Sequence, residues 1–309
     1  MLLEIIHDTT YKYEPSVEIA QHLLHLKPQN TSTQIVLKTD LRISPTTSWT
    51  EERTDVYGNI SNYLSLENRH QELSISVNSI IKTIKYSGAI LAPDKTKNWE
   101  NVREYFRYHS NTQWDSASEY LFNSPFITTS HKFQEFARLT FTGNKPILKA
   151  AIELMTFIYK EFKYVSKSTD INTPALIALE NKEGVCQDFA HILITSLRSL
   201  GLPAKYISGY ILSTPPPGKE RLIGSDASHA WVSIYIPELD ENGKLTNGLW
   251  CDLDPTNNRW GFGSPGEDYV FLAQGRDYSD VSPVKGVIHG GADHQLDVAV
   301  TVRPVTQLI

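Results

Sequence analysis

The segment Glu183-Gly-Val-Cys-Gln-Asp-Phe-Ala-His191 places a cysteine directly before the apolar stripe of a predicted helix. Apolar residues then recur at helical spacing until Gly201 ends the pattern, which predicts a helix over 186–200. Cys186 therefore lies at a helix N-terminus, where unpaired N–H groups and the helix dipole favour an anion. A thiolate at such a position is a competent nucleophile. The alternative is a small buried helix residue, because free cysteines are often buried.

A histidine follows at the start of the alternating segment 229–236, where a strand is predicted over 230–236. His229 and Trp231 share one face of this strand, so the indole would help to exclude water from the imidazole. A histidine beside a thiol can take its proton and pass it to a leaving amine. The competing interpretation is that His229 is one ordinary histidine among ten.

An aspartate closes the next predicted strand, 249–254, directly before Pro255. A carboxylate at Asp254 can accept the second imidazole N–H and fix the histidine tautomer. The segment Asp-Pro-Thr-Asn is also a good turn sequence by itself. Asp252 lies on the same strand face as Asp254 and is the rival carboxylate, while Cys251 lies on the opposite face and is expected to be packed in the core.

The chain on either side of these segments predicts an α+β protein. Residues 1–95 form a β-rich N-terminal domain, an antiparallel sandwich or barrel, with strands expected near 3–13, 34–43, 60–66 and 72–86. Residues 96–309 form a core in which helices pack on an antiparallel sheet. Helices are predicted at 99–109, 131–139, 146–163 and 174–182, strands at 204–212 and 296–302, and a proline-rich loop at 213–218.

Composition excludes several classes of protein. The chain has 309 residues, 29 basic against 35 acidic side chains and a net charge of −6, which argues against a nucleic-acid partner. No segment approaches the 18 apolar residues of a membrane span, so no membrane partner is expected. Two cysteines cannot form a disulfide framework, and a cytoplasmic protein is expected.

Four segments, taken in order, resemble the core motifs of the transglutaminase-like superfamily of papain-like thiol enzymes. They are Gly184-Val-Cys-Gln-Asp-Phe-Ala-His191, Gly201-Leu-Pro-Ala-Lys-Tyr-Ile-Ser-Gly-Tyr210, His229-Ala-Trp-Val232 and Asp254-Pro-Thr-Asn257. The β-rich start, with Tyr57-Gly-Asn59, is similar to the N-terminal region of bacterial members. The segment 276–286 and the final strand resemble the C-terminal part of those members.

The resemblance implies a catalytic triad of Cys186, His229 and Asp254. Bacterial members are described as cysteine proteases or amidases, so hydrolysis of amide or peptide bonds is the expected reaction. The backbone N–H of Cys186 is a natural oxyanion donor. Tyr164 is the candidate second donor, by analogy with the superfamily position before the nucleophile, and it reads equally well as a core tyrosine. Gln187 is expected to point elsewhere, since it follows the thiol on a helix.

A polar cluster near the end of the core is a candidate substrate cleft together with Trp231, or alternatively a hydrogen-bonded loop. Its members are Arg276, Asp277, Tyr278 and Asp280. His289, Asp293 and His294 could suggest a metal site, but Gly290-Gly291 between them indicates a turn. No Cys or His spacing is typical of zinc, and no acidic loop resembles a calcium site, so neither metal nor cofactor is expected.

Other functions remain open on the sequence alone. An amine acceptor would make the protein a cross-linking transglutaminase, and the superfamily also contains deamidases. The chain could be a non-catalytic binding scaffold, or Cys186, His229 and Asp254 could hold a metal. The sequence does not identify the peptide or amide substrate, the acyl acceptor or the oligomeric state.

Overall fold

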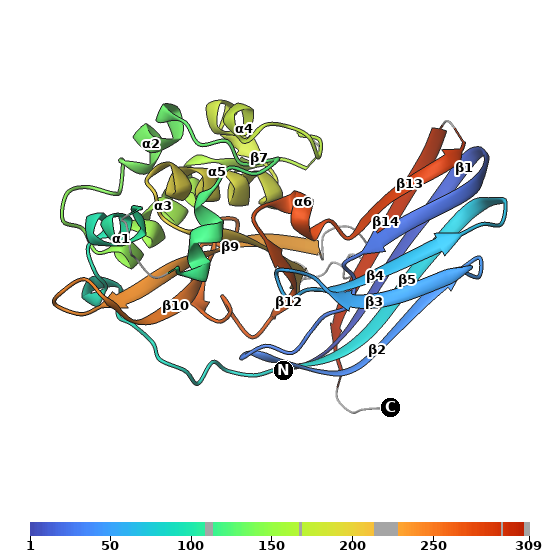
Figure 1. Ribbon diagram of the computed structural model, residues 1–309, viewed down its shortest axis with the longest axis horizontal. Helices are drawn as coiled ribbons and strands as arrows, with labels where there is room; N and C mark the ends of the chain where they lie inside the picture. Colours follow the sequence, from blue (N-terminus) through green and yellow to red (C-terminus); the bar gives the residue numbers. More distant parts are fainter. Residues whose placement is uncertain (109–113, 167–168, 213–227, 292, 306–309) are drawn as a thin grey trace, which may run out of the picture.

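The structure is a computed structural model that describes residues 1–108, 114–166, 169–212, 228–291 and 293–305. It is an α+β protein, as the sequence predicts. A curled antiparallel sheet forms one part, and helices packed on a second antiparallel sheet form the other (Figure 1). The first part is a single sheet that curls on itself, and not two stacked sheets.

The curled sheet is built around the 23-residue strand β1 (Leu2–Leu24). Buried and more exposed side chains alternate along its first half, as expected for a strand that covers a core with one face. The strand order is β2-β5-β1-β4-β3. The bounds are β2 (Gln34–Ser44), β3 (Trp49–Thr54), β4 (Ile60–Leu66) and β5 (His70–Thr83).

The last two strands of the chain return to this sheet. Both β13 (Val284–Gly290) and β14 (Asp293–Pro304) pair with β1, and Leu3 lies opposite Pro304. Gly290 and Gly291 have positive φ values of 80° and 70°, a region that glycine adopts without strain. The sequence assigned the C-terminal strand to the core, whereas in the structure it extends the N-terminal sheet.

The second sheet has the order β11-β10-β9-β8-β12, and α5 packs against its centre (Figure 1). Its strands are β8 (Ala204–Ile211), β9 (Ser228–Leu239), β10 (Leu245–Asp254), β11 (Arg259–Phe262) and β12 (Tyr269–Gly275). A two-stranded parallel ladder joins β6 (Lys163–Tyr164) to β7 (Glu183–Gly184). The helices are α1 (Trp99–Phe106), α2 (His131–Ala137), α3 (Ile147–Glu161), α4 (Ala175–Asn181), α5 (Cys186–Ser199) and α6 (Tyr278–Val281), with short 3-10 helices at Pro93–Lys95 and Ser116–Leu121.

The predicted helices and central strands lie where the hydrophobic pattern placed them. The sequence did not predict the strands β3, β12 and β13. It also missed the shorter elements β6, β7, β11 and α6, because segments of two to four residues carry no periodicity. The helix predicted over 99–109 ends at Phe106. The proline-rich loop predicted at 213–218 lies outside the described residues.

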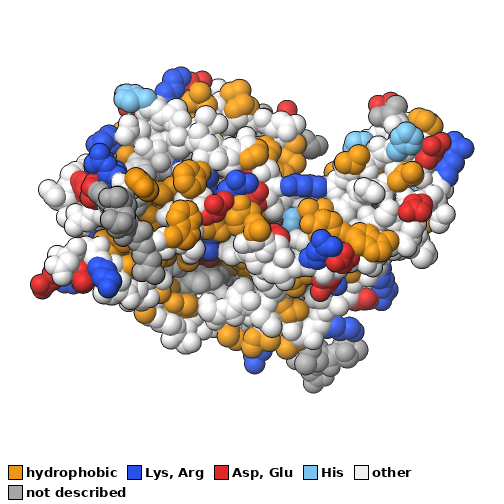
Figure 2. All heavy atoms as spheres, in the orientation of Figure 1, with side chains coloured by type: hydrophobic (Ala, Val, Ile, Leu, Met, Phe, Trp, Pro, Cys, Tyr) orange, Lys and Arg blue, Asp and Glu red, His pale blue; other side chains and the backbone are white. Residues whose placement is uncertain are grey.

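One hydrophobic core joins the two parts. Leu3 and Ile5 from β1 and Val300 and Val302 from β14 are buried in the same cluster as the inward face of α5. The curled sheet is therefore docked against the helical part at one end. Its other end, with the β13–β14 hairpin, projects beyond the body of the molecule (Figure 2). Over the described ranges, no helix combines the length and apolar character needed to cross a membrane.

Three buried histidines make the fold sensitive to acid. Burial lowers the pKa of His7, His22 and His191 to about 4 from an ordinary value of 6.5. Between pH 6.5 and 4 the unfolded chain thus binds more protons than the folded one, and stability falls as the pH falls. Near pH 5 the three groups together give a slope of about 4 kcal/mol per pH unit, at about 1.4 kcal/mol for each.

Urea unfolding at pH 7, 6 and 5 measures this slope. The variant His22→Leu removes one of the three titrating groups and should reduce the slope by about one third. If the pH slope of stability is the same in His22→Leu and in the wild type, the folded protein holds His22 protonated.

Candidate active site

Cys186 occupies the first position of α5, after the N-cap residue Val185. The ladder between β6 and β7 brings the chain into this position, since Val165 N–H donates to Gly184 O at 3.0 Å. Cys186 is half-buried and unpaired with any other cysteine. The thiol therefore lies at the helix N-terminus predicted from the sequence, next to backbone N–H groups that have no partner within the helix.

Asp188 fixes this helix start without contacting the thiol. Its Oδ2 accepts the backbone N–H of Val185 at 2.8 Å and the hydroxyl of Thr169 at 2.7 Å. A Cβ at Gly184 would lie 2.7 Å from Asp188 Oδ2, so only glycine allows this close approach. The sequence Gly-Val-Cys-Gln-Asp thus encodes the position of the cysteine backbone.

His229 at the start of β9 lies between Cys186 and Asp254. Its Nε2 is 2.7 Å from Asp254 Oδ2, and the Cys186 side chain lies near enough to its ring to contribute to the raised pKa of His229. His229 is 8% exposed and Asp254 is fully buried, so solvent screens this contact weakly. The structure thus brings together the three side chains that the sequence singled out as a triad.

Two residues that the sequence did not single out hold Asp254. The Tyr269 hydroxyl donates to Asp254 Oδ2 at 2.6 Å, and Asn257 Nδ2 donates to the same oxygen at 2.8 Å. The other oxygen, Oδ1, accepts the backbone N–H groups of Thr256 and Asn257. Every partner of this carboxylate is a donor, which fixes its orientation toward His229.

These contacts set the charges of the pair. Burial alone would lower the pKa of His229, but the hydrogen bond with Asp254 and the nearness of Cys186 outweigh it and raise the pKa to about 10. Burial would raise the pKa of Asp254, yet the hydrogen bonds from His229, Tyr269 and Asn257 hold it below its ordinary value. His229 and Asp254 thus stabilise each other's charged forms.

The rival carboxylate, Asp252, belongs to a different network. Trp231 Nε1 donates to Asp252 Oδ2 at 3.1 Å, and the Lys205 ammonium faces the same carboxylate. Cys251 on the opposite strand face is fully buried in the hydrophobic core. The choice of Asp254 over Asp252 as the partner of His229 agrees with this geometry.

A cavity of about 250 Å³ opens beside the thiol, and we call it the Cys186 cavity. It receives side chains from both parts of the molecule. The helical part contributes Cys186, Gln187, Tyr206, Ser208, Gly209, Tyr210, Ser228, His229, Ala230, Leu272 and Tyr278, and the segment that leads into β13 contributes Pro283 and Val284. The curled sheet contributes His7, Thr9, Tyr11, Leu296 and Val298.

Of the predicted cleft residues, Tyr278 lines the Cys186 cavity. Arg276 and Asp280 instead bind each other, with Arg276 Nε 2.9 Å from Asp280 Oδ2. Asp277 is fully buried and accepts the backbone N–H of Phe126 at 2.7 Å. Trp231 is 1% exposed and lies behind His229, with the two ring centres 6.2 Å apart. These four residues do not line the cavity, because their polar groups are engaged inside the protein.

The oxyanion candidates are the backbone N–H of Cys186, at the first position of α5, and the side chain of Tyr164. Tyr164 is on β6, directly beside Gly184, and its ring packs against Phe189 with centres 6.3 Å apart. It is 52% exposed and is not among the residues that line the cavity. Gln187 is among the residues that line the cavity, but its Nε2 donates to Ile171 O at 3.2 Å, so its amide is engaged elsewhere, as expected. Its position on the first turn of α5 keeps it next to the opening.

The histidines around Gly290-Gly291, which could suggest a metal site, lie at the far end of the curled sheet. His289 Nε2 is 3.8 Å from Glu18 Oε2, and the His294 ring packs near Tyr11 and Tyr13. Over the described part of the chain, no group of three or more His, Cys, Asp or Glu side chains has the geometry to hold a metal ion.

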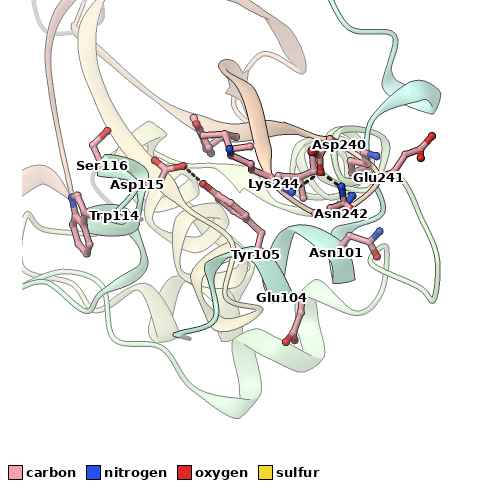
Figure 3. A pocket seen from close by; sticks show the side chains of 15 residues that line it. Asn101, Glu104, Tyr105, Trp114, Asp115, Ser116, Asp240, Glu241, Asn242 and Lys244 are labelled. Carbon is pink, nitrogen blue, oxygen red and sulfur yellow. Dashed lines mark hydrogen bonds between the residues drawn. The ribbon is translucent and has the colours of Figure 1, made fainter. Parts of the chain in front are cut away.

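A larger hollow of about 1260 Å³ lies between α1 and the β9–β10 hairpin (Figure 3). Two of its carboxylates accept hydrogen bonds from neighbouring groups. The Tyr105 hydroxyl donates to Asp115 at 3.0 Å, and Asp240 accepts the backbone N–H groups of Asn242 and Lys244. Its described lining contains none of the three triad residues. The Cys186 cavity is therefore the better candidate for chemistry.

Comparison with known proteins agrees with this architecture. Residues 3–82 match the model of the bacterial transglutaminase-like N-terminal region, and residues 134–255 match the model of the transglutaminase-like superfamily. An uncharacterized protein of Mycobacterium tuberculosis is 35% identical over 309 residues, which covers 97% of this chain and 92% of the relative. A protein-glutamine gamma-glutamyltransferase of Pseudomonas aeruginosa is 26% identical over 115 residues, 36% of this chain and 16% of the relative.

Among solved structures, a "putative cysteine protease" from Cytophaga hutchinsonii is similar over nearly the whole chain. The match covers 99% of this chain and 92% of that one, with a TM-score of 0.67 and 22% sequence identity. At this identity the likeness shows a shared fold, which includes both the curled sheet and the helical part.

Proposed function

Because the chain belongs to the transglutaminase-like superfamily and begins with the bacterial transglutaminase-like N-terminal region, we propose that it is a thiol-dependent acyl-transfer enzyme. Cys186 is the nucleophile, His229 is the general acid and base, and Asp254 orients His229. The substrate is an amide or peptide, and water is the acyl acceptor. The cytoplasmic location expected from the sequence remains a prediction.

The convergence of three side chains from α5, β9 and β10 is the observation that carries this proposal. His229 lies 2.7 Å from Asp254, and both His229 and Cys186 line the same cavity. Acyl transfer needs a nucleophile, a base and a carboxylate that orients the base, placed next to one another. They lie beside a cavity that can admit the substrate.

The reaction would follow from these contacts in two steps. The thiol proton of Cys186 passes to His229 as the sulfur attacks the carbonyl carbon and a C–S bond forms. The C–N bond breaks, and His229 gives its proton to the leaving amine. Water then attacks the thioester carbon and gives a proton to His229, the C–S bond breaks, the acid is released, and His229 returns a proton to the sulfur. The Cys186 N–H would stabilise the oxyanion.

A second candidate function is transfer of the acyl group to an amine. It rests on the similarity between part of this chain and the Pseudomonas aeruginosa gamma-glutamyltransferase. The triad chemistry is the same up to the thioester, and the acceptor then decides between the two functions.

Trapping of an acyl-enzyme tests the proposal. The protein is mixed with a library of peptides and amides, quenched in acid, digested and read by mass spectrometry. We expect the acyl mass on the peptide that contains Cys186, and the free acid as the product in water. Addition of a primary amine then decides the acceptor, because a product that contains the amine in place of the acid identifies a transferase.

Iodoacetamide gives the complementary result. Cys186 should be alkylated at least about tenfold faster than a free thiol near pH 6, because reactive cysteines occur at helix N-termini and beside histidines. If Cys186 is neither acylated nor alkylated faster than free cysteine, the protein is a binding scaffold and the proposal fails.

A further inference from the structure

The curled sheet supplies one wall of the Cys186 cavity, which we call the sheet wall. It consists of His7, Thr9 and Tyr11 on β1 and Leu296 and Val298 on β14. In the antiparallel register Tyr11 lies opposite Leu296, and Thr9 lies opposite Val298. Because alternate residues of a strand share a face, these positions form a continuous row that faces the thiol.

This wall is fixed against the helical part by hydrogen bonds and packing. His7 Nδ1 lies 2.9 Å from the Tyr210 hydroxyl, and His7 Nε2 lies 3.2 Å from Thr9 Oγ1. Tyr210 is on β8 next to Gly209, which pairs with His229. The sheet wall is therefore tied to the strand pair that holds the catalytic histidine.

The sheet wall carries no charged side chain at neutral pH, and the part of it on β14 is apolar. Leu296 and Val298 are 47% and 39% exposed beside the thiol, although apolar residues of this size usually gain by burial. Burial keeps His7 neutral, because it lowers the pKa of His7 to about 4. The described lining of the whole cavity contains no Asp, Glu, Lys or Arg side chain.

The size and charge of the cavity limit what it can accept. A cavity of about 250 Å³ is small for a ligand pocket and suits one large side chain. A charged side chain that entered it would lose water. The one charged group on the described walls is the His229 imidazolium, which is already paired with Asp254 at 2.7 Å. An aromatic or large aliphatic side chain would cover Leu296, Val298 and Tyr11 and gain the free energy of apolar burial.

We propose that β1 and β14 form a substrate subsite, and that it receives an uncharged, apolar side chain on the acyl side of the bond that Cys186 attacks. The inference rests on the proposed acyl transfer and names the class of acyl donor. It also gives the curled sheet a function, since the sheet then selects the substrate.

Acylation by a panel of N-acetyl amino-acid thioesters tests this subsite. The donors carry phenylalanine, leucine, glycine, aspartate or lysine and share one leaving thiol, so the side chain is the only variable. In each reaction the Cys186 sulfur forms a C–S bond to the carbonyl carbon, the donor C–S bond breaks, and the released thiol takes the proton. Acylation of Cys186 is followed by rapid quench and mass spectrometry.

The phenylalanine and leucine donors should acylate Cys186 at least about tenfold faster than the aspartate and lysine donors. The variant Leu296→Asp should lower the ratio of the phenylalanine rate to the glycine rate about tenfold, and Val298→Asp should act in the same direction. The ratio is the readout because a general loss of activity cancels in it.

Val287→Asp is the matched control, because Val287 lies on the neighbouring strand β13, is 76% exposed and does not line the cavity. It should leave the phenylalanine-to-glycine ratio at its wild-type value. Equal rates for all five donors, or an unchanged ratio in both Leu296→Asp and Val298→Asp, would overturn the subsite while acyl transfer still stands. Absence of acylation by every donor would instead overturn the proposed function.

Discussion

Cys186→Ala should reduce acyl transfer by at least about 1,000-fold, to the rate of the uncatalysed reaction. The substitution removes the sulfur that would form the thioester, while the apolar packing of α5 stays intact because its stripe begins after this residue. Single-turnover acylation by an activated thioester measures the loss. Thermal unfolding should be close to wild type, since residue 186 is half-buried at a helix end.

Cys251→Ala is the control that separates the two cysteines. Cys251 is fully buried on β10, and its thiol faces Gly261 O at 3.7 Å, inside the core. Removing its sulfur should cost about 1 kcal/mol of stability and leave acylation at the wild-type rate. Acylation that survives in Cys186→Ala, or that is lost in Cys251→Ala at full stability, would refute the assignment of the nucleophile.

The positions of Cys186, His229 and Asp254 could be predicted because each depends on local pattern. A helical stripe that begins after residue 186 fixes the helix start. Alternation of apolar and polar residues along β9 and β10 is enough to assign His229 and Asp254 to faces of the sheet. Local periodicity was therefore sufficient to predict the site residues that lie near the ends of helices and strands.

The sheet wall of the cavity could not be predicted in this way. Leu296 lies opposite Tyr11 although the two residues come from opposite ends of the chain, and no local pattern encodes such a pairing. The alternation in 296–302 predicts a strand and leaves its partner open. For the same reason the sequence assigned this strand to the core.

Polar residues were the least predictable part of the site. The Arg276–Asp280 pair looks like a cleft in the sequence, yet the two side chains satisfy each other. Asn257 had a signal that was interpreted only as a turn, since Asp-Pro-Thr-Asn also places an amide beside the carboxylate of Asp254. Tyr269 reaches Asp254 from β12, and nothing in its sequence neighbourhood predicts this contact.

Asp254→Asn should lower the rate of acylation by about 1,000-fold. Both oxygens of Asp254 accept hydrogen bonds, from His229, Tyr269 and Asn257 on one side and from two backbone N–H groups on the other. Asparagine has an NH₂ group in place of one carboxylate oxygen. Whichever way the amide is turned, this NH₂ group would face hydrogen-bond donors. His229 would lose a charged partner, and its pKa should fall from about 10 toward its ordinary value.

The matched substitution Asp252→Asn tests whether this loss is specific to the contact with His229. Asp252 is buried on the same strand, two residues before Asp254, but its carboxylate binds Trp231. Asp252→Asn should therefore destabilise the fold while acylation stays within about tenfold of wild type. The deciding readout is the pKa of His229, measured by NMR titration of its ring. If both variants act only by disturbing the fold, His229 should have the same pKa in both. If Asp252→Asn lowers that pKa and the rate as much as Asp254→Asn does, Asp254 is not the positioning residue.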